Sequence, residues 1–167
     1  ESRTNRQICT ATWDLFLDQP PIGLRPIYIP KSPLQSITSV KYYATDGTLT
    51  TWGSGNYIVT SGREPAEIRP AFNIVWPVAQ FRQDAVAVRF VAGYGLTAAV
   101  PAIIQEVILR LVAHWFENRE SAAIGTVQSI PFAIDDMLAQ LTIGDEFVDF
   151  AHSYRGERGP FDTLPTL

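Results

Sequence analysis

The sequence predicts an α+β fold: an antiparallel β-subdomain over residues 7–92, then a C-terminal helical hairpin over residues 101–141 and an extended tail. Three observations predict this arrangement. Short runs that alternate apolar and polar residues, separated by Pro and Gly, fill the first two-thirds of the chain. A long pattern of helical period follows them. Near the C-terminus the periodicity weakens, and Gly, Pro and mixed charge appear. We therefore expect one domain over residues 1–148 and a flexible tail over residues 149–167.

The strands of the β-subdomain are predicted from alternation and from the residues that end each run. The first strand has an apolar face that includes Cys9, which we expect to be a small buried hydrophobe. Asp46-Gly47 predicts a two-residue hairpin turn. The expected strands are residues 9–17, 27–29, 36–45, 49–52, 57–61 and 86–92. Residues 57–61 are expected to continue the meander. Residues 65–77 are less regular, and the core contacts expected from them are Ile68, Phe72, Ile74 and Trp76.

A long amphipathic helix is predicted to begin at Pro101, because proline at the first helical position loses no hydrogen bond. Gly93 and Gly95 before it allow the preceding strand to end abruptly. Glu106 and Arg110 form an i,i+4 pair on its polar face. A second helix is expected at residues 131–141. The apolar stripe of the first helix, which we expect to pack in the core, consists of Ile103, Ile104, Val107, Ile108, Leu111, Val112, Trp115 and Phe116.

Composition indicates a globular chain with few charges. Of the 167 residues, 46% are apolar and 18% are charged, and the formal net charge is -4. The 13 Lys and Arg residues are scattered, which argues against the clustered positive charge that duplex DNA binding requires. No apolar run approaches the roughly 20 residues that span a bilayer, so we expect no membrane partner. The single cysteine excludes an intramolecular disulfide framework.

No pattern of catalytic, metal-binding or cofactor-binding residues is found. Cys9 lies in no motif that would pair a nucleophile with a general base. His114 and His152 lie in no motif with the spacing of metal ligands. Asp135-Asp136 matches no calcium loop, and we interpret the pair as solvated acid. We therefore expect that the protein is not an enzyme and uses no metal or cofactor.

Aromatic residues of the predicted meander leave an alternative open. Tyr42, Tyr43, Trp52 and Tyr57 could form an exposed platform, because neighbouring tyrosines on one strand cannot both point inward. On this alternative the chain is a monomeric carbohydrate- or protein-binding β-module.

Three sequence blocks resemble a known family. They are RFVAGYG followed by VP at residues 89–101, a helix that closes on HWFENRE, and SIPFAIDDMLA at residues 129–139. In this order and spacing they resemble the phage head–tail connector (adaptor) family. These gp6-like proteins occur in long-tailed phages, prophages and gene transfer agents. The resemblance covers roughly residues 7–141.

The resemblance implies a structural role in virion assembly. Subunits of such proteins form a homo-oligomeric ring, of twelve copies, that docks on the portal protein of a DNA-filled head. The ring joins the head to a tail-completion or stopper protein, and DNA passes through the lumen without specific binding. The implied location is the head–tail interface of a virion or phage-like particle, with assembly in the host cytoplasm. Family members carry helical sequence before the first strand, and residues 1–6 would be its last turn, with Asn5 as a left-handed cap.

Two sets of residues are predicted contacts of this assembly. As hypothetical subunit-interface residues we take Asp46, Gly47, Glu106, Arg110, His114 and Glu117, from the predicted hairpin and the polar helix face. For portal binding we take the tail residues Tyr154, Arg155, Phe161, Leu164 and Leu167. An extended tail can dock apolar anchors into a partner's grooves and become ordered on binding.

Overall fold

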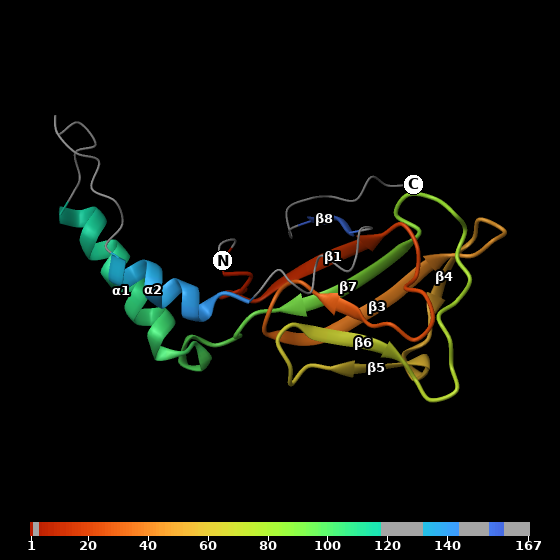
Figure 1. Cartoon of the computed structure of the whole chain (residues 1–167), viewed down its shortest axis with the longest axis horizontal. Helices are drawn as coiled ribbons and strands as arrows, with labels where there is room; N and C mark the ends of the chain where they lie inside the picture. Colours follow the sequence, from red (N-terminus) through yellow and green to blue (C-terminus); the bar gives the residue numbers. More distant parts are fainter. Residues whose placement is uncertain (2–3, 118–131, 144–153, 159–167) are drawn as a thin grey trace.

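The computed structural model describes residues 1, 4–117 and 132–143, and residues 154–158 as backbone. A two-layered β-body forms one end of the molecule, and two helices project from it side by side (Figure 1). The paired strands of both sheets are antiparallel. The α+β class predicted from the sequence is therefore confirmed.

The larger sheet has five strands in the order β4-β3-β7-β1-β8. Its central row pairs Leu15 of β1 with Val88 of β7, and Val88 with Val40 of β3. All three side chains are buried, so this row belongs to the core. A strand in the tail was not predicted. The strands are β1 (Ala11–Leu17), β3 (Leu34–Tyr43), β4 (Leu49–Trp52), β7 (Val86–Ala92) and β8 (Tyr154–Arg158).

A second, three-stranded sheet replaces the single meander that the sequence predicted. Its order is β2 (Ile27–Ile29), β6 (Ala66–Pro70) and β5 (Tyr57–Thr60), so the segment expected to be irregular contains its central strand. The alternation of β6 is hidden because Glu67 is buried together with both of its neighbours. The cost of burying the Glu67 carboxylate is offset because Nε and Nη2 of Arg69 each donate a hydrogen bond to one of its oxygens, both at 3.0 Å.

The hydrophobic core lies between the two sheets. Ile27, Ile29 and Ile68 of the smaller sheet are fully buried against the inner face of the larger one. Burial of each such side chain contributes about 1.5–3 kcal/mol. One end of the core is aromatic: the rings of Trp52 and Trp76 lie 4.8 Å apart between centroids, and Tyr57 stacks on Trp52 at 5.5 Å. The core contacts expected of Ile68, Ile74 and Trp76 are confirmed.

Several local predictions were wrong. The first strand begins at Ala11 and Cys9 is exposed, because the backbone before Ala11 pairs instead with the loop at Ser32. Phe72, expected in the core, is 89% exposed. The β3–β4 connection is not a two-residue turn: Tyr43 pairs with Leu49, so five residues separate the strands. Two short 3-10 helices, Ser54–Asn56 and Thr97–Ala99, lie in other connections.

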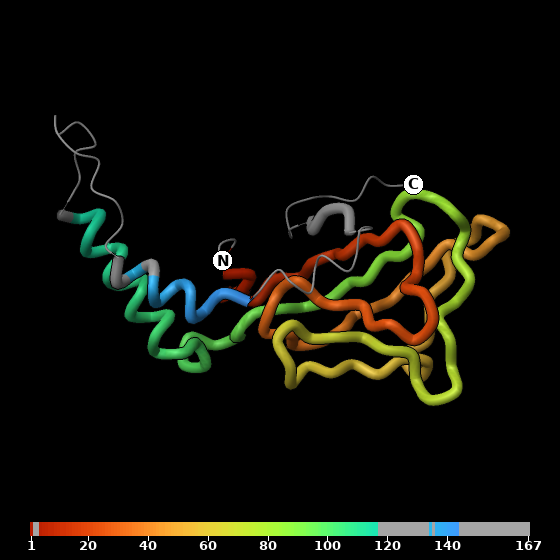
Figure 2. Tube along the Cα trace, in the orientation of Figure 1, coloured from red at the N-terminus to blue at the C-terminus, as the bar shows by residue number. Residues whose placement is uncertain are grey.

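The two predicted helices are α1 (Ala102–Glu117) and α2 (Phe132–Leu141). Ile104 and Val107 of α1 and Ile134 of α2 are buried. Trp115 and Phe116, predicted to be core residues, are 64% and 65% exposed. In the chain trace α1 runs away from the β-body with α2 beside it (Figure 2). Part of the apolar stripe of α1 therefore stays exposed.

Candidate interaction surfaces

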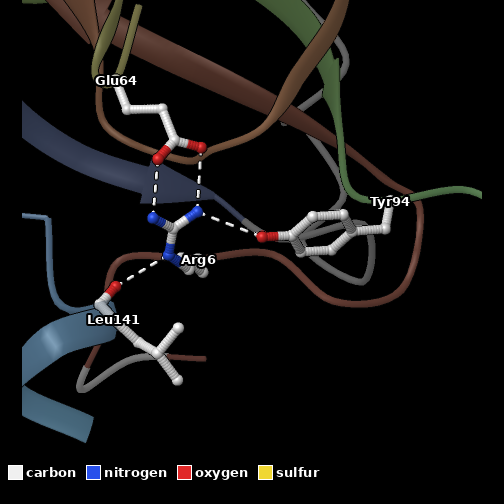
Figure 3. A network of polar contacts seen from close by, with 4 residues as sticks. All are labelled: Arg6, Glu64, Tyr94 and Leu141. Carbon is white, nitrogen blue, oxygen red and sulfur yellow. Dashed lines mark hydrogen bonds and ion pairs between the residues drawn. The ribbon is translucent and has the colours of Figure 1, made fainter. Parts of the chain in front are cut away.

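The junction between the β-body and the helices is organised by Arg6 (Figure 3). Its Nε donates to the carbonyl oxygen of Leu141 at 2.7 Å, at the end of α2. Its two terminal nitrogens donate to the two carboxylate oxygens of Glu64, at 2.8 and 2.6 Å. Nη1 also donates to the hydroxyl of Tyr94 at 3.1 Å. One side chain thereby connects the N-terminal segment, the β5–β6 loop, the turn after β7 and the end of α2.

The guanidinium of Arg6 stays charged in this position. Burial lowers the pKa of Arg6, but hydrogen bonding and attraction from Glu64 outweigh burial and raise the pKa above its ordinary value. The arrangement is a bidentate Arg–carboxylate pair, the geometry in which such pairs are strongest.

Backbone contacts around Arg6 hold the same junction. The amide of Ile143 donates to the carbonyl oxygen of Thr4 at 3.1 Å. Asn5 has a φ of 54°, which confirms the predicted left-handed conformation, and its side chain donates to the carbonyl oxygen of Ile143 at 3.3 Å. Behind them, Gly93 packs against the backbone at Cys9 and Thr10 with a φ of 126°, a combination that only glycine accommodates.

The predicted subunit-interface residues do not come together. Asp46 and Gly47 lie in the β3–β4 connection, at the end of the β-body far from the helices (Figure 1). Glu106 and Arg110 form the predicted i,i+4 ion pair on α1 at 2.6 Å, with both side chains half exposed. His114 is partly buried, and the side chain of Glu117 lies outside the described residues.

The Asp46 turn is locally ordered. An Asp46 carboxylate oxygen accepts hydrogen bonds from the hydroxyl and the amide of Thr48, at 2.6 and 2.9 Å. These two bonds lower the pKa of the Asp46 carboxyl, the hydroxyl contributing most. Gly47 has a φ of 85°, which favours glycine.

The most conspicuous exposed surface of the helices is apolar. We call it the α1 apolar face, and its side chains are between 42% and 69% exposed. At 100° per residue these positions span an arc of about 120° on the helix. Sequence analysis assigned most of them to the core, since periodicity shows that a face is apolar without showing what covers it. The α1 apolar face consists of Ile108, Leu109, Val112, Trp115 and Phe116.

A second apolar surface lies at the opposite end of the molecule. We call it the loop-end cluster, and its side chains are between 64% and 96% exposed. Beside it is a cleft of about 300 Å³ whose lining includes Pro20, Pro21, Trp76 and Phe81. The members of the loop-end cluster come from the loops after β1 and β6, which gave no periodic signal in the sequence. The loop-end cluster consists of Ile22, Leu24, Phe72, Val75, Val78 and Phe81.

The aromatic platform considered from the sequence does not form. Trp52 is buried and stacked on Tyr57, and both pack in the core region. Tyr42 packs against the core, while the Arg82 guanidinium covers the ring of Tyr43 at 3.9 Å. These four residues therefore offer no shared open surface to a sugar.

The predicted portal-binding residues are only partly placed. Tyr154 begins β8 and its backbone pairs with Leu17 of β1. Arg155 follows in the same strand. Phe161, Leu164 and Leu167 lie outside the described residues, so the prediction of portal binding stays a prediction.

Within the described ranges, no group of three or more His, Cys, Asp or Glu side chains could hold a metal ion. Over the same ranges, none of the helices is both long and apolar enough to cross a membrane.

Comparison with known proteins finds likeness only at the level of structure. No protein-family model matches this sequence, and no curated protein matches it at a significant level. A chain in the virion of a native gene transfer agent (GTA) particle superposes with a TM-score of 0.68 at 19% identity, covering 86% of this chain and 71% of that one.

Two further structures give the same result. In the neck of a native GTA particle, computed with C12 symmetry, a chain matches with a TM-score of 0.67 at 17% identity, over 86% of this chain and 75% of that one. In the neck of an empty GTA particle, computed with C6 symmetry, the TM-score is 0.67 at 19% identity, over 86% and 71%. The chain thus shares the fold of chains found in GTA particles.

Proposed function

We propose that this chain is a structural, non-catalytic component of the neck of a phage-like particle, acting as a head–tail connector. The observation that carries the proposal is the shared fold with chains of the GTA virion and neck over 86% of this sequence. The sequence resemblance to connector proteins supports it independently. Its blocks fall on β7, on the turn at Gly93, and on α1 and α2, which together form the junction and the projecting helices.

As a connector the chain works as a homo-oligomeric ring, with twelve copies matching the symmetry of a portal. A closed ring requires heterologous contacts, in which one surface of a subunit meets a different surface of its neighbour. The elongated shape, with exposed apolar surfaces at both ends, suits a subunit that contacts several partners.

The partners of the ring are the portal protein on the head side and a tail-completion or stopper protein on the tail side. Tail residues 153–167 are the proposed portal anchor. DNA passes through the lumen without being held, which the net charge of -4 favours because counterion-releasing contacts are few. The site of action is the head–tail interface, after assembly in the host cytoplasm.

The test is affinity capture of the tagged chain from a lysate of its source that is making particles, followed by mass spectrometry. We expect portal and tail-completion proteins among the captured proteins, and labelled chain at the neck of purified particles by electron microscopy. A lysate without particle production is the control. If portal and tail-completion proteins are present in the lysate but neither is captured, the proposal is wrong.

A further inference from the structure

We infer that the α1 apolar face is the contact between subunits, and that it packs against the helix pair of a second copy of this chain. The inference rests on the ring assigned under the proposed function, and it identifies the surface that forms that ring.

The first argument is exposure within the chain itself. Ile104 and Val107 of α1 are buried, whereas Trp115 and Phe116 on the same helix are about two-thirds exposed. The helices project from the β-body (Figure 1), and the described residues leave these side chains exposed. A second molecule packed against α1 would remove them from water.

The second argument is the size of this surface. A buried Phe or Trp covers about 150–250 Å², so the five side chains together expose on the order of 500 Å² of apolar area. That area is comparable to the largest apolar patch on a typical monomer, which is often functional. It would supply more than half of the roughly 800 Å² that each partner contributes to a standard interface.

The third argument is the geometry of the surface. Ile108, Val112 and Trp115 follow an i, i+4, i+7 spacing, which is the pattern of a helix that packs along another helix. The occupant is therefore helical. In a symmetric ring, the projecting helix pair of a neighbouring copy lies at the same radius and height, and it supplies that helix.

The polar face of α1 has a secondary role in this arrangement. Glu106 and Arg110 already satisfy each other in an exposed ion pair. Their place at the subunit interface stays a prediction, and the apolar arc beside them is the surface inferred here.

The experiment compares matched variants by analytical ultracentrifugation and photo-crosslinking. Val112→Glu and Trp115→Glu alter the α1 apolar face, and Val78→Glu and Phe81→Glu alter the loop-end cluster, where the side chains are at least as exposed. Circular dichroism melting checks that each variant remains folded. We expect the α1 variants to lower self-association at least tenfold and the loop-end variants to leave it unchanged.

Crosslinking identifies the occupant. With p-benzoylphenylalanine in place of Trp115, crosslinks are mapped in the purified chain and in particle-producing lysate. Crosslinks to residues 102–117 or 132–143 of a second copy support the inference. Crosslinks only to another protein, absence of any copy-to-copy product in both samples, or full self-association of the α1 variants would overturn it.

The two proposals fail separately. If a chain carrying Val112→Glu and Trp115→Glu enters particle necks normally, the proposed function stands and this inference is wrong. If the chain self-associates through α1 but is never recovered with portal or tail-completion proteins, this inference stands and the proposed function is wrong.

Discussion

The Arg6 guanidinium donates a 2.7 Å hydrogen bond to the carbonyl oxygen of Leu141, which is 135 residues away in the sequence. The same guanidinium grips Glu64 with two further bonds. A helix end leaves carbonyl oxygens without intrahelical partners, so this bond also caps α2. Arg6 therefore holds the projecting helices to the β-body.

Replacement of Arg6 is expected to destabilise the junction. Arg6→Ala removes a partly buried charged donor from acceptors on three residues and should lower the free energy of unfolding by about 2–3 kcal/mol. Arg6→Lys keeps the positive charge but loses the planar set of donors. Its free energy of unfolding should lie between that of the original chain and that of Arg6→Ala. Urea denaturation measures both. Arg110→Ala, which breaks an exposed ion pair, is the control and should cost only about 0.3–0.5 kcal/mol. Equal effects of Arg6→Ala and Arg110→Ala would contradict this role.

Gly93 is expected to tolerate no side chain. A Cβ at this position would lie 2.7 Å from the carbonyl oxygen of Cys9, in a backbone conformation that disfavours L-residues. Gly93→Ala should cost more than about 3 kcal/mol. Gly55→Ala, where a Cβ meets nothing and φ is ordinary, should change stability by less than about 0.5 kcal/mol. Thermal melting of the two variants distinguishes close packing from a general sensitivity of glycines.

The second sheet can be tested at β6. Ile68 is fully buried, so Ile68→Ala should lower the free energy of unfolding by about 2–5 kcal/mol through loss of burial and the cavity left behind. Ile58 on neighbouring β5 is exposed, and Ile58→Ala should be within about 0.5 kcal/mol of the original chain. Similar urea midpoints for the two variants would show that Ile68 does not lie in the core.

The turn at Asp46 predicts a dependence on pH. Since folding lowers the pKa of Asp46, its contribution to stability is present above the ordinary aspartate pKa and is lost as the pH falls through the folded pKa. Thr48→Val removes the hydroxyl donor and should raise the pKa of Asp46 towards its ordinary value, as followed by NMR titration of the carboxyl carbon. Asp46→Asn is the control, in which this titration disappears. An unchanged pKa in Thr48→Val would mean that the backbone amide alone produces the shift.

Removal of residues 153–167 tests the proposed portal anchor. The truncated chain should lose portal binding in a pull-down with purified portal protein. The truncation also removes β8, the edge strand that pairs with β1, so its melting temperature should fall. Triple substitution of Phe161, Leu164 and Leu167 by Ser keeps β8 and should abolish portal binding without that fall. Undiminished binding by the truncated chain would place the anchor elsewhere.

Much of the fold was predictable because local pattern and burial agree. The burial of β7 alternates along the strand as its sequence pattern does, and α2 at Phe132–Leu141 lies within the predicted residues 131–141. β6 was not predictable, because Ala66, Glu67 and Ile68 are all buried and their burial does not alternate. The strand is defined by its pairing with β2 and β5, which the local sequence does not display.

The candidate surfaces were less predictable than the fold. The apolar arc of α1 was visible in the sequence, but Trp115 carries the same signal whether the protein's own core or another molecule covers it. The contacts of Arg6 depend on Glu64 and Leu141, which only the fold brings near. The loop-end cluster has no period at all, so nothing marked Phe81 as a surface residue.

The junction also has a mechanical consequence. Three stretches of chain meet there: residues 4–8, the turn at Tyr94, and residues 141–143, each bonded to another across the gap. A force applied to the helices is therefore shared by three parallel tethers and does not fall on one linker. We therefore expect a displacement at the tip of the helix pair to be transmitted to the β-body through these contacts.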